Sequence, residues 1–134
     1  MTAISKIEGI GDAYAAKLKT VGVASLETLL EKGATPKGRK ELVSATGISD
    51  ALILKWINRA DLFRVKGIGE EYSDLLEKAG VDTALELAQR KPENLLKKLA
   101  EINAEKNLVR QLPSISQVTA WVEFAATLPR VVEY

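Results

Sequence analysis

The 134-residue chain contains no cysteine and no histidine. Without cysteine it has no disulfide framework, no thiol nucleophile and no thiolate metal site. Without histidine it lacks the side chain used most often in general acid–base catalysis. Two carboxylate pairs remain, Glu70 with Glu71 and Glu101 with Glu105, and both fall on predicted solvent-facing helix surface. We therefore expect no enzyme activity, no catalytic residues, no cofactor and no side-chain metal site.

Long apolar runs and an excess of one charge are also missing. No run approaches the ~18 residues of a membrane span, and the first residues lack the basic-then-apolar pattern of a signal peptide. These features predict a cytoplasmic protein with no membrane partner. The 19 Lys and Arg residues are offset by 18 Asp and Glu residues, giving a net charge of +1. Nucleic-acid-binding domains usually carry a basic excess, so any such role depends on how the charges are distributed.

One stretch of the chain occurs twice. Residues 7–18 read IEGIGDAYAAKL, and residues 65–76, which start 58 positions later, read VKGIGEEYSDLL. Apolar positions three apart before the glycines and on a 3.6 period after them predict two short helices. Glycine takes positive φ without a Cβ clash, so Gly-Ile-Gly permits a sharp turn between them. The central residues, Ile10 and Ile68, are expected to point into the joint.

This spacing resembles the helix-hairpin-helix motif, hydrophobic-x-x-hydrophobic-x-Gly-hydrophobic-Gly-x-x-x-Ala-x-x-hydrophobic. The first copy meets the pattern throughout, and the second has Ser73 in place of alanine. Degenerate copies, Gly47-Ile48-Ser49 and Ser114-Ile115-Ser116, stand where two further turns would be. The chain is similar to an uncharacterised prokaryotic family of duplicated helix-hairpin-helix domains, which has no assigned activity.

The resemblance implies an all-α, paired-hairpin, SAM-domain-like bundle of about ten to eleven short helices. The first repeat would span residues 1–61 and the second 62–134, packed as one body. No stretch alternates apolar and polar residues for long enough to predict a sheet. The connection around residues 60–62 lacks the composition of a flexible linker, which favours a rigid body.

Capping residues predict several helix limits. Ser25 is expected to cap a helix over 26–32, and Thr35 followed by Pro36 a helix over 36–46. Four glycines are predicted to end helices: Gly22, Gly33, Gly47 and Gly80. Of these, Gly22 and Gly47 are expected to take the left-handed conformation. Asn103 is expected to take the same left-handed role in the second half. The residues after Pro129 are expected to be extended.

The aromatic residues recur with the repeat. Trp56 and Trp121 lie at equivalent positions among aliphatic residues, and Tyr14 and Tyr72 follow the two glycine turns. Stacking against bases is one interpretation. Their helical spacing among isoleucine and leucine favours core anchors instead.

A binding role has a physical mechanism. A Gly-hydrophobic-Gly turn that opens a helix exposes unpaired backbone N–H groups beside the positive end of the helix dipole, which suits a phosphate. By resemblance, the contacting groups would be the backbone of Gly9, Ile10 and Gly11 in the first turn, and of Gly67 and Gly69 in the second. The nearest cations are Lys6, Lys17 and Lys66, and a second basic patch contains Lys37, Arg39 and Lys40.

Acidic residues directly after the turns oppose this role. Asp12 follows the first turn, while Glu70 and Glu71 follow the second. Carboxylates in the first helical turn satisfy the dipole themselves and repel a phosphate. We therefore expect the second turn not to bind phosphate and the first turn to bind it weakly.

Two hypotheses from different classes follow. The first is sequence-independent binding to the backbone of double-stranded DNA or RNA, through the first turn and the basic patch. The second is a protein-interaction or scaffold module in which the hairpins serve only as structural joints. The sequence predicts neither the partner nor the oligomeric state.

Overall fold

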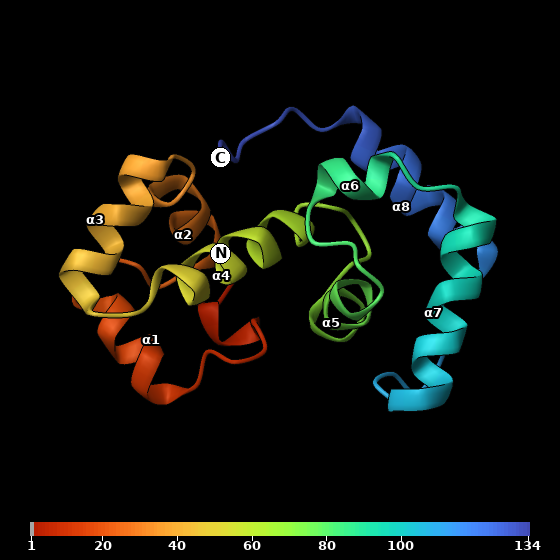
Figure 1. Cartoon of the computed structure of the whole chain (residues 1–134), viewed down its shortest axis with the longest axis horizontal. Helices are drawn as coiled ribbons and strands as arrows, with labels where there is room; N and C mark the ends of the chain where they lie inside the picture. The colour runs from red at the N-terminus through yellow and green to blue at the C-terminus, as the bar shows by residue number, and fades with distance from the viewer. Residues whose placement is uncertain (1) are drawn as a thin grey trace. The chain divides into compact units, whose positions relative to one another are not determined.

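The computed structural model describes residues 2–134, which form eight α-helices and one 3₁₀ helix (Figure 1). In chain order they are η1 (Ile4–Lys6), α1 (Asp12–Lys19), α2 (Leu26–Lys32), α3 (Pro36–Thr46), α4 (Asp50–Leu62), α5 (Glu70–Lys78), α6 (Ala84–Ala88), α7 (Pro92–Lys106) and α8 (Ile115–Thr127). In this part of the chain the only β pairing is an isolated bridge between Ala3 and Ser25. The fold is all-α, as expected.

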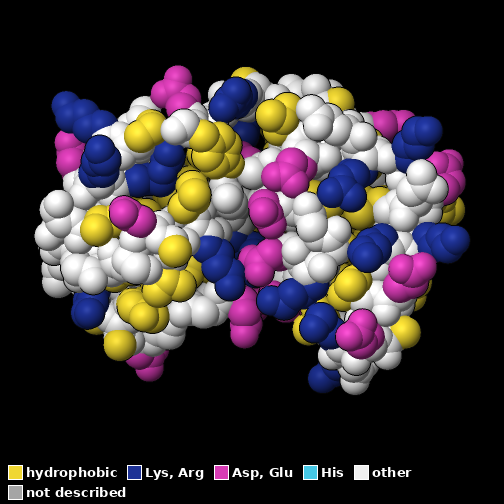
Figure 2. All heavy atoms as spheres, viewed as in Figure 1, with side chains coloured by type: hydrophobic (Ala, Val, Ile, Leu, Met, Phe, Trp, Pro, Cys, Tyr) yellow, Lys and Arg dark blue, Asp and Glu magenta, His cyan; other side chains and the backbone are white. Residues whose placement is uncertain are grey.

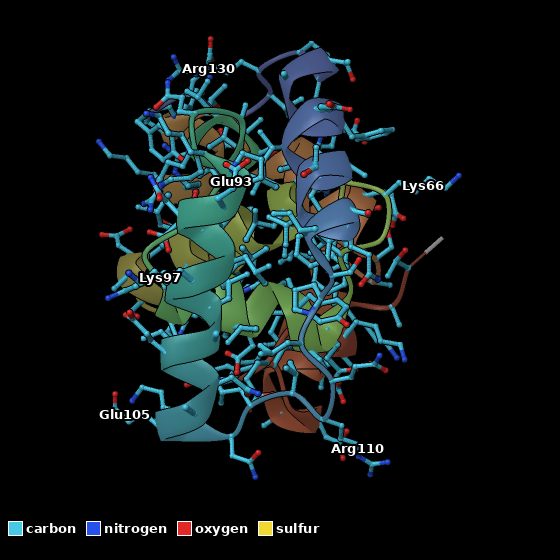
Figure 3. The ribbon with its side chains drawn as sticks, turned by 90° about the vertical axis from the view of Figure 1, so that its right-hand side faces the viewer. Lys66, Glu93, Lys97, Glu105, Arg110 and Arg130 are labelled. Carbon is cyan, nitrogen blue, oxygen red and sulfur yellow. The ribbon has the colours of Figure 1, made fainter. Side chains whose placement is uncertain are left out.

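The chain forms two compact units. Unit 1 comprises the chain up to Asp61 together with Arg130–Tyr134, and unit 2 comprises Leu62–Pro129. In unit 1, α1 contacts η1, and α2 contacts α3. In unit 2, α8 packs against α6 and α7, and α5 packs against α7. Figure 3 shows α7 and α8 side by side.

In the segment before each glycine turn, burial and backbone hydrogen bonds repeat every three residues. Ile4, Ile7 and Ile10 are all buried, and the amides of Ile7 and Ile10 each donate to the carbonyl three residues earlier. In unit 2, Leu62, Val65 and Ile68 repeat the burial and the bonds. Bonds of this i, i+3 type belong to the 3₁₀ helix, which has three residues per turn.

The short helix expected before the first turn is present as a 3₁₀ helix, whereas the separate helix expected before the second turn is not. Only Ile4–Lys6 forms a short 3₁₀ helix, and in unit 2 α4 ends at Leu62 without a separate helix after it. Residues 107–114 are also non-helical, because α7 continues to Lys106 and the chain then turns towards α8. These differences explain why the described residues hold fewer helices than the ten to eleven expected.

Most helix limits follow the capping residues. The side chains of Ser25 and Thr35 accept hydrogen bonds from the backbone amides of Thr28 and Gly38, at 3.2 and 3.1 Å. The helices they cap span the predicted ranges, and Gly47 ends α3 in the left-handed conformation with φ +73°. Gly22 takes positive φ after α1, as expected, and Gly80 also takes positive φ after α5. The residues after Pro129 contain no helix or strand.

The prediction for Asn103 was wrong. Asn103 lies inside α7, and the left-handed residue after the helix is Asn107, with φ +51°. The side chain of Asn103 instead holds the following loop: its Oδ1 accepts from the Val109 amide at 2.9 Å, and its Nδ2 donates to the Val109 carbonyl at 3.2 Å. Val109 is buried, so both of its backbone groups need a partner.

Replacing Asn103 with alanine is expected to destabilise the protein by about 1–2 kcal/mol, because the buried amide of Val109 loses its partner. Denaturant unfolding followed by circular dichroism measures the effect. Asn94→Ala, at an exposed position of the same helix, is the matched control and is expected to change stability by less than ~0.5 kcal/mol. Equal effects from the two variants would contradict this role.

Candidate nucleic-acid interface

The first glycine turn exposes backbone at the start of α1. Gly9 takes φ +97°, in the region that favours glycine, while Gly11 is extended with φ −86° and ψ −173°. Both glycines are exposed, and Ile10 between them is buried. Within residues 2–134 the amides of Gly11, Asp12 and Ala13 have no hydrogen-bond acceptor. These N–H groups are the unsatisfied donors of a helix start.

A buried tryptophan packs against this turn on its core side. A Cβ atom added to Gly9 would lie 3.8 Å from Nε1 of Trp56, which belongs to α4. Trp56 is only 1% exposed, and its ring meets the ring of Tyr14 with centroids 5.1 Å apart and planes 66° apart. This edge-to-face geometry is favourable for aromatic pairs. Trp56 is therefore part of the core, as the sequence indicated, and holds the turn in place.

The second turn has the same construction in unit 2. Gly67 takes φ +94°, and Ile68 is buried. Trp121 of α8 approaches closer than Trp56 does, since its Nε1 lies 3.0 Å from a Cβ added to Gly67. The rings of Trp121 and Tyr72 have centroids 5.0 Å apart. Each unit thus has a glycine turn, a buried isoleucine and a tyrosine–tryptophan pair.

The two turns differ in the charges that follow them. Asp12 is the single acidic residue in the first turn of α1, whereas α5 begins with Glu70 and Glu71. All three side chains are exposed. Gly69 is half-buried where Gly11 is exposed. The second turn therefore presents more negative charge and less open backbone than the first.

The predicted cations near the turns are exposed. Lys6 ends η1 and Lys17 lies in the last turn of α1. Lys66 precedes Gly67, and Figure 3 shows it extending away from the ribbon. Each of them is accessible to an anion in solution.

The structure does not bring the predicted basic patch to the first turn. Lys37, Arg39 and Lys40 lie at the start of α3, and Figure 1 shows this start at the opposite end of unit 1 from the start of α1. Lys37 and Lys40 are exposed. Arg39 is half-buried, and its Nη1 donates to the carbonyl of Gly33 at 2.8 Å while its Nη2 donates to the carbonyl of Glu133 at 2.7 Å. The Arg39 side chain is thus held by backbone carbonyls, which sequence reasoning missed.

Two hollows lie along α3 in unit 1. The first, of about 520 Å³, is shallow and open, and it is lined by Lys37, Lys40, Glu41, Ser44 and Ala45. The second, of about 280 Å³, is more enclosed, and it is lined by Val21, Lys32, Gly38, Glu41, Leu42 and Ala45. Lysine, glutamate and apolar groups are mixed in both. Neither hollow was predicted: the first is lined by α3 alone, and the second combines α3 with Val21 and Lys32 from two other segments.

Charges of both signs are interspersed on the surface. Figure 2 shows Lys and Arg side chains among Asp and Glu side chains over the face that it draws. In the described part of the chain, no three acidic residues come together as a metal site would need. Across residues 2–134, the helices are all too short or too polar to cross a bilayer.

Comparison with known proteins identifies a family. Residues 8–128 match the domain of unknown function DUF4332. The chain belongs to this family. The DUF4332 match includes both glycine turns and both tryptophans, and it ends before Arg130–Tyr134. No curated protein and no solved structure matches the chain.

Proposed function

We propose that unit 1 is a non-catalytic module that binds the phosphate backbone of double-stranded nucleic acid through the Gly9–Gly11 turn. The observation that carries the proposal is the set of three free amides at the start of α1, on a turn held by a buried isoleucine and tryptophan. Free amides at a helix start combine hydrogen-bond donors with the positive end of the dipole. The resemblance of residues 7–18 to a helix-hairpin-helix supports the same role.

Binding by this turn is independent of base sequence. Ile10 is buried, and Gly9 and Gly11 have no side chain to reach a base edge. Contacts to phosphate position a protein on a duplex without reading its sequence. Lys6, exposed three residues before Gly9, adds a cation close in sequence to the turn.

Asp12 weakens the interaction, since its carboxylate lies at the first position of α1 where a phosphate would bind. Asp12→Asn removes that charge and is expected to strengthen duplex binding about two- to fivefold, from the ~0.3–1 kcal/mol of a charge at a helix end. Asp50→Asn, at the first position of α4, is the matched control and is expected to change binding little. Weaker binding by Asp12→Asn would contradict the proposed orientation.

Fluorescence anisotropy with a labelled 20-base-pair duplex tests the function itself. At ~50 mM salt we expect binding that falls linearly on a log–log plot as salt rises, with a slope of about −0.9 for each phosphate contacted. Two duplexes of unrelated sequence should give equal affinities. An absence of binding at ~50 mM salt would reject the proposal.

A second candidate function is a protein-interaction module. Four large apolar side chains of unit 2 remain exposed: Leu85, Leu112, Ile115 and Phe124. Exposed apolar side chains of this size are available to pack against a partner protein, and apolar surface of this kind is found at interaction sites. Under this function the chain elutes from a sizing column as an oligomer or captures a protein partner, and it shows no salt-dependent duplex binding.

A further inference from the structure

The segment Arg130–Tyr134, which we name the strap, belongs to unit 1 although unit 2 separates it from the rest of that unit. It follows Pro129, the last residue of unit 2, whose carbonyl accepts from Nη2 of Arg64 at 2.7 Å. Arg64 lies just after the point where the chain enters unit 2. Both ends of unit 2 are therefore fastened together, and the strap provides a second chain connection to unit 1.

Unit 1 holds both backbone groups of one strap residue, Glu133. The amide of Glu133 donates to the carbonyl of Ala34 at 2.7 Å, and the carbonyl of Glu133 accepts from Arg39 at 2.7 Å. Its carboxylate side chain is exposed. Recognition of both backbone groups, with the side chain directed to solvent, leaves residue 133 free to vary. Hydrogen bonds to the main chain likewise supply affinity where proteins bind extended peptides.

The residues on either side of Glu133 supply side-chain recognition. Val132 is buried at 4% exposure. The hydroxyl of Tyr134 donates to Oδ1 of Asn58 at 2.6 Å. The Tyr134 ring lies 5.8 Å from the guanidinium carbon of Arg39 and 5.9 Å from that of Arg130, within reach of cation–π attraction. The pattern recognised is an apolar residue, a variable residue and a tyrosine.

From these contacts we infer that unit 1 carries a docking site for an extended peptide of the form Val-x-Tyr, formed by Ala34, Arg39 and Asn58, and that the chain occupies it with its own strap in an exchangeable way. Only one strap side chain is buried, and Tyr134 remains 59% exposed. A contact this small barely offsets the entropy lost on ordering five residues. The strap stays docked because its covalent link to the rest of the chain gives it a high effective concentration at the site.

Release of the strap removes its contacts with Ala34 and Asn58 of unit 1. It also frees Arg39 from the carbonyl of Glu133, next to the exposed Lys37 and Lys40. The site is thus a peptide-binding site that a segment of the same chain occupies reversibly.

The test uses the full chain labelled with ¹⁵N. Val132→Asp places a charge in the buried position and is expected to release the strap, so that the amide of residue 133 exchanges with solvent at least ~10-fold faster than in the unmodified protein. Glu133→Gln is the matched control and should keep slow exchange, because only the backbone of that residue is held. Signals of Ala34, Arg39 and Asn58 should shift in Val132→Asp and stay unchanged in the control.

A synthetic peptide with the sequence of residues 130–134 is then added to the Val132→Asp variant at millimolar concentration, which matches the effective concentration of a short tether. We expect the shifted signals to return towards those of the unmodified protein. A peptide lacking the tyrosine hydroxyl should bind roughly two- to tenfold more weakly, as expected for one lost hydrogen bond. Failure of the peptide to restore the signals would overturn the inference. So would unfolding of unit 1 in Val132→Asp, since the strap would then be part of the core.

Discussion

Replacing Trp56 with alanine is expected to lower the free energy of unfolding by about 3–5 kcal/mol, as for other large-to-small changes of a buried tryptophan. Trp56 is almost completely buried, contacts the ring of Tyr14 and lies beneath Gly9. Its removal leaves a cavity under the glycine turn as well as in the core. The turn then loses its fixed geometry, and duplex binding is expected to fall with the stability.

Denaturant unfolding followed by circular dichroism measures this loss. Each unit has one of the two tryptophans, so the fluorescence of Trp121 in the Trp56→Ala variant reports separately on unit 2. Phe124→Ala removes a smaller aromatic ring that is 37% exposed and should cost far less. A loss below ~1 kcal/mol for Trp56→Ala would contradict its role as support for the turn.

Gly38→Ala is expected to destabilise the protein although it lies within a helix. By intrinsic propensity alone, alanine in place of glycine favours a helix by roughly 1 kcal/mol. A Cβ atom at this position, however, would lie 2.1 Å from the backbone carbonyl oxygen of Lys32 at the end of α2. Because that atom belongs to the backbone, α2 and α3 must separate, at a cost of about 1–3 kcal/mol or more.

Whether Gly38→Ala raises or lowers the free energy of unfolding decides between the gain in helix propensity and the clash with α2. Thermal or denaturant unfolding of Gly38→Ala measures it, and Gly11→Ala provides the control. An added Cβ at Gly11 meets nothing within 4 Å, and its φ of −86° suits any residue, so this variant should lose only the preference for glycine over alanine at an N-cap, about 1 kcal/mol or less. Stabilisation by Gly38→Ala would mean that α2 and α3 do not meet as closely as described.

Local signals in the sequence were sufficient for the helices that begin at a capping side chain. Ser25 and Thr35 each accept the backbone bond that their residue type favours, and α2 and α3 have the predicted limits. The burial of Ile10 and Ile68 also follows from local spacing, because a glycine on each side leaves the isoleucine alone to fill the joint. These features depend on neighbours within four residues.

Features that depend on distant residues were not predictable. Arg39 was interpreted as a phosphate contact because it lies between two lysines. Its guanidinium instead binds the carbonyl of Glu133, 94 residues away in sequence. Asn103 was expected to end a helix because asparagine favours the left-handed conformation, yet four residues later Asn107 satisfies that preference. Nothing local distinguishes the two asparagines, and the hydrogen bonds of Asn103 to Val109 decide between them.

The two turns share a backbone geometry but differ in what they present to a ligand. Each is built on a tyrosine–tryptophan pair, so the turns need no ligand to account for their fold. The difference in phosphate binding that we propose rests on the residues after the second glycine, one carboxylate after Gly11 and two after Gly69. Unit 1 is therefore the unit in which phosphate binding should be sought.

An NMR titration of the ¹⁵N-labelled chain with duplex DNA at ~50 mM salt, a concentration at which backbone contacts are strong, tests this account most directly. We predict that the largest amide shifts occur at residues 9–13, that shifts at residues 67–71 are small, and that both sets vanish as salt rises. Shifts that leave residues 9–13 unchanged, or that are equal at the two turns, would contradict it.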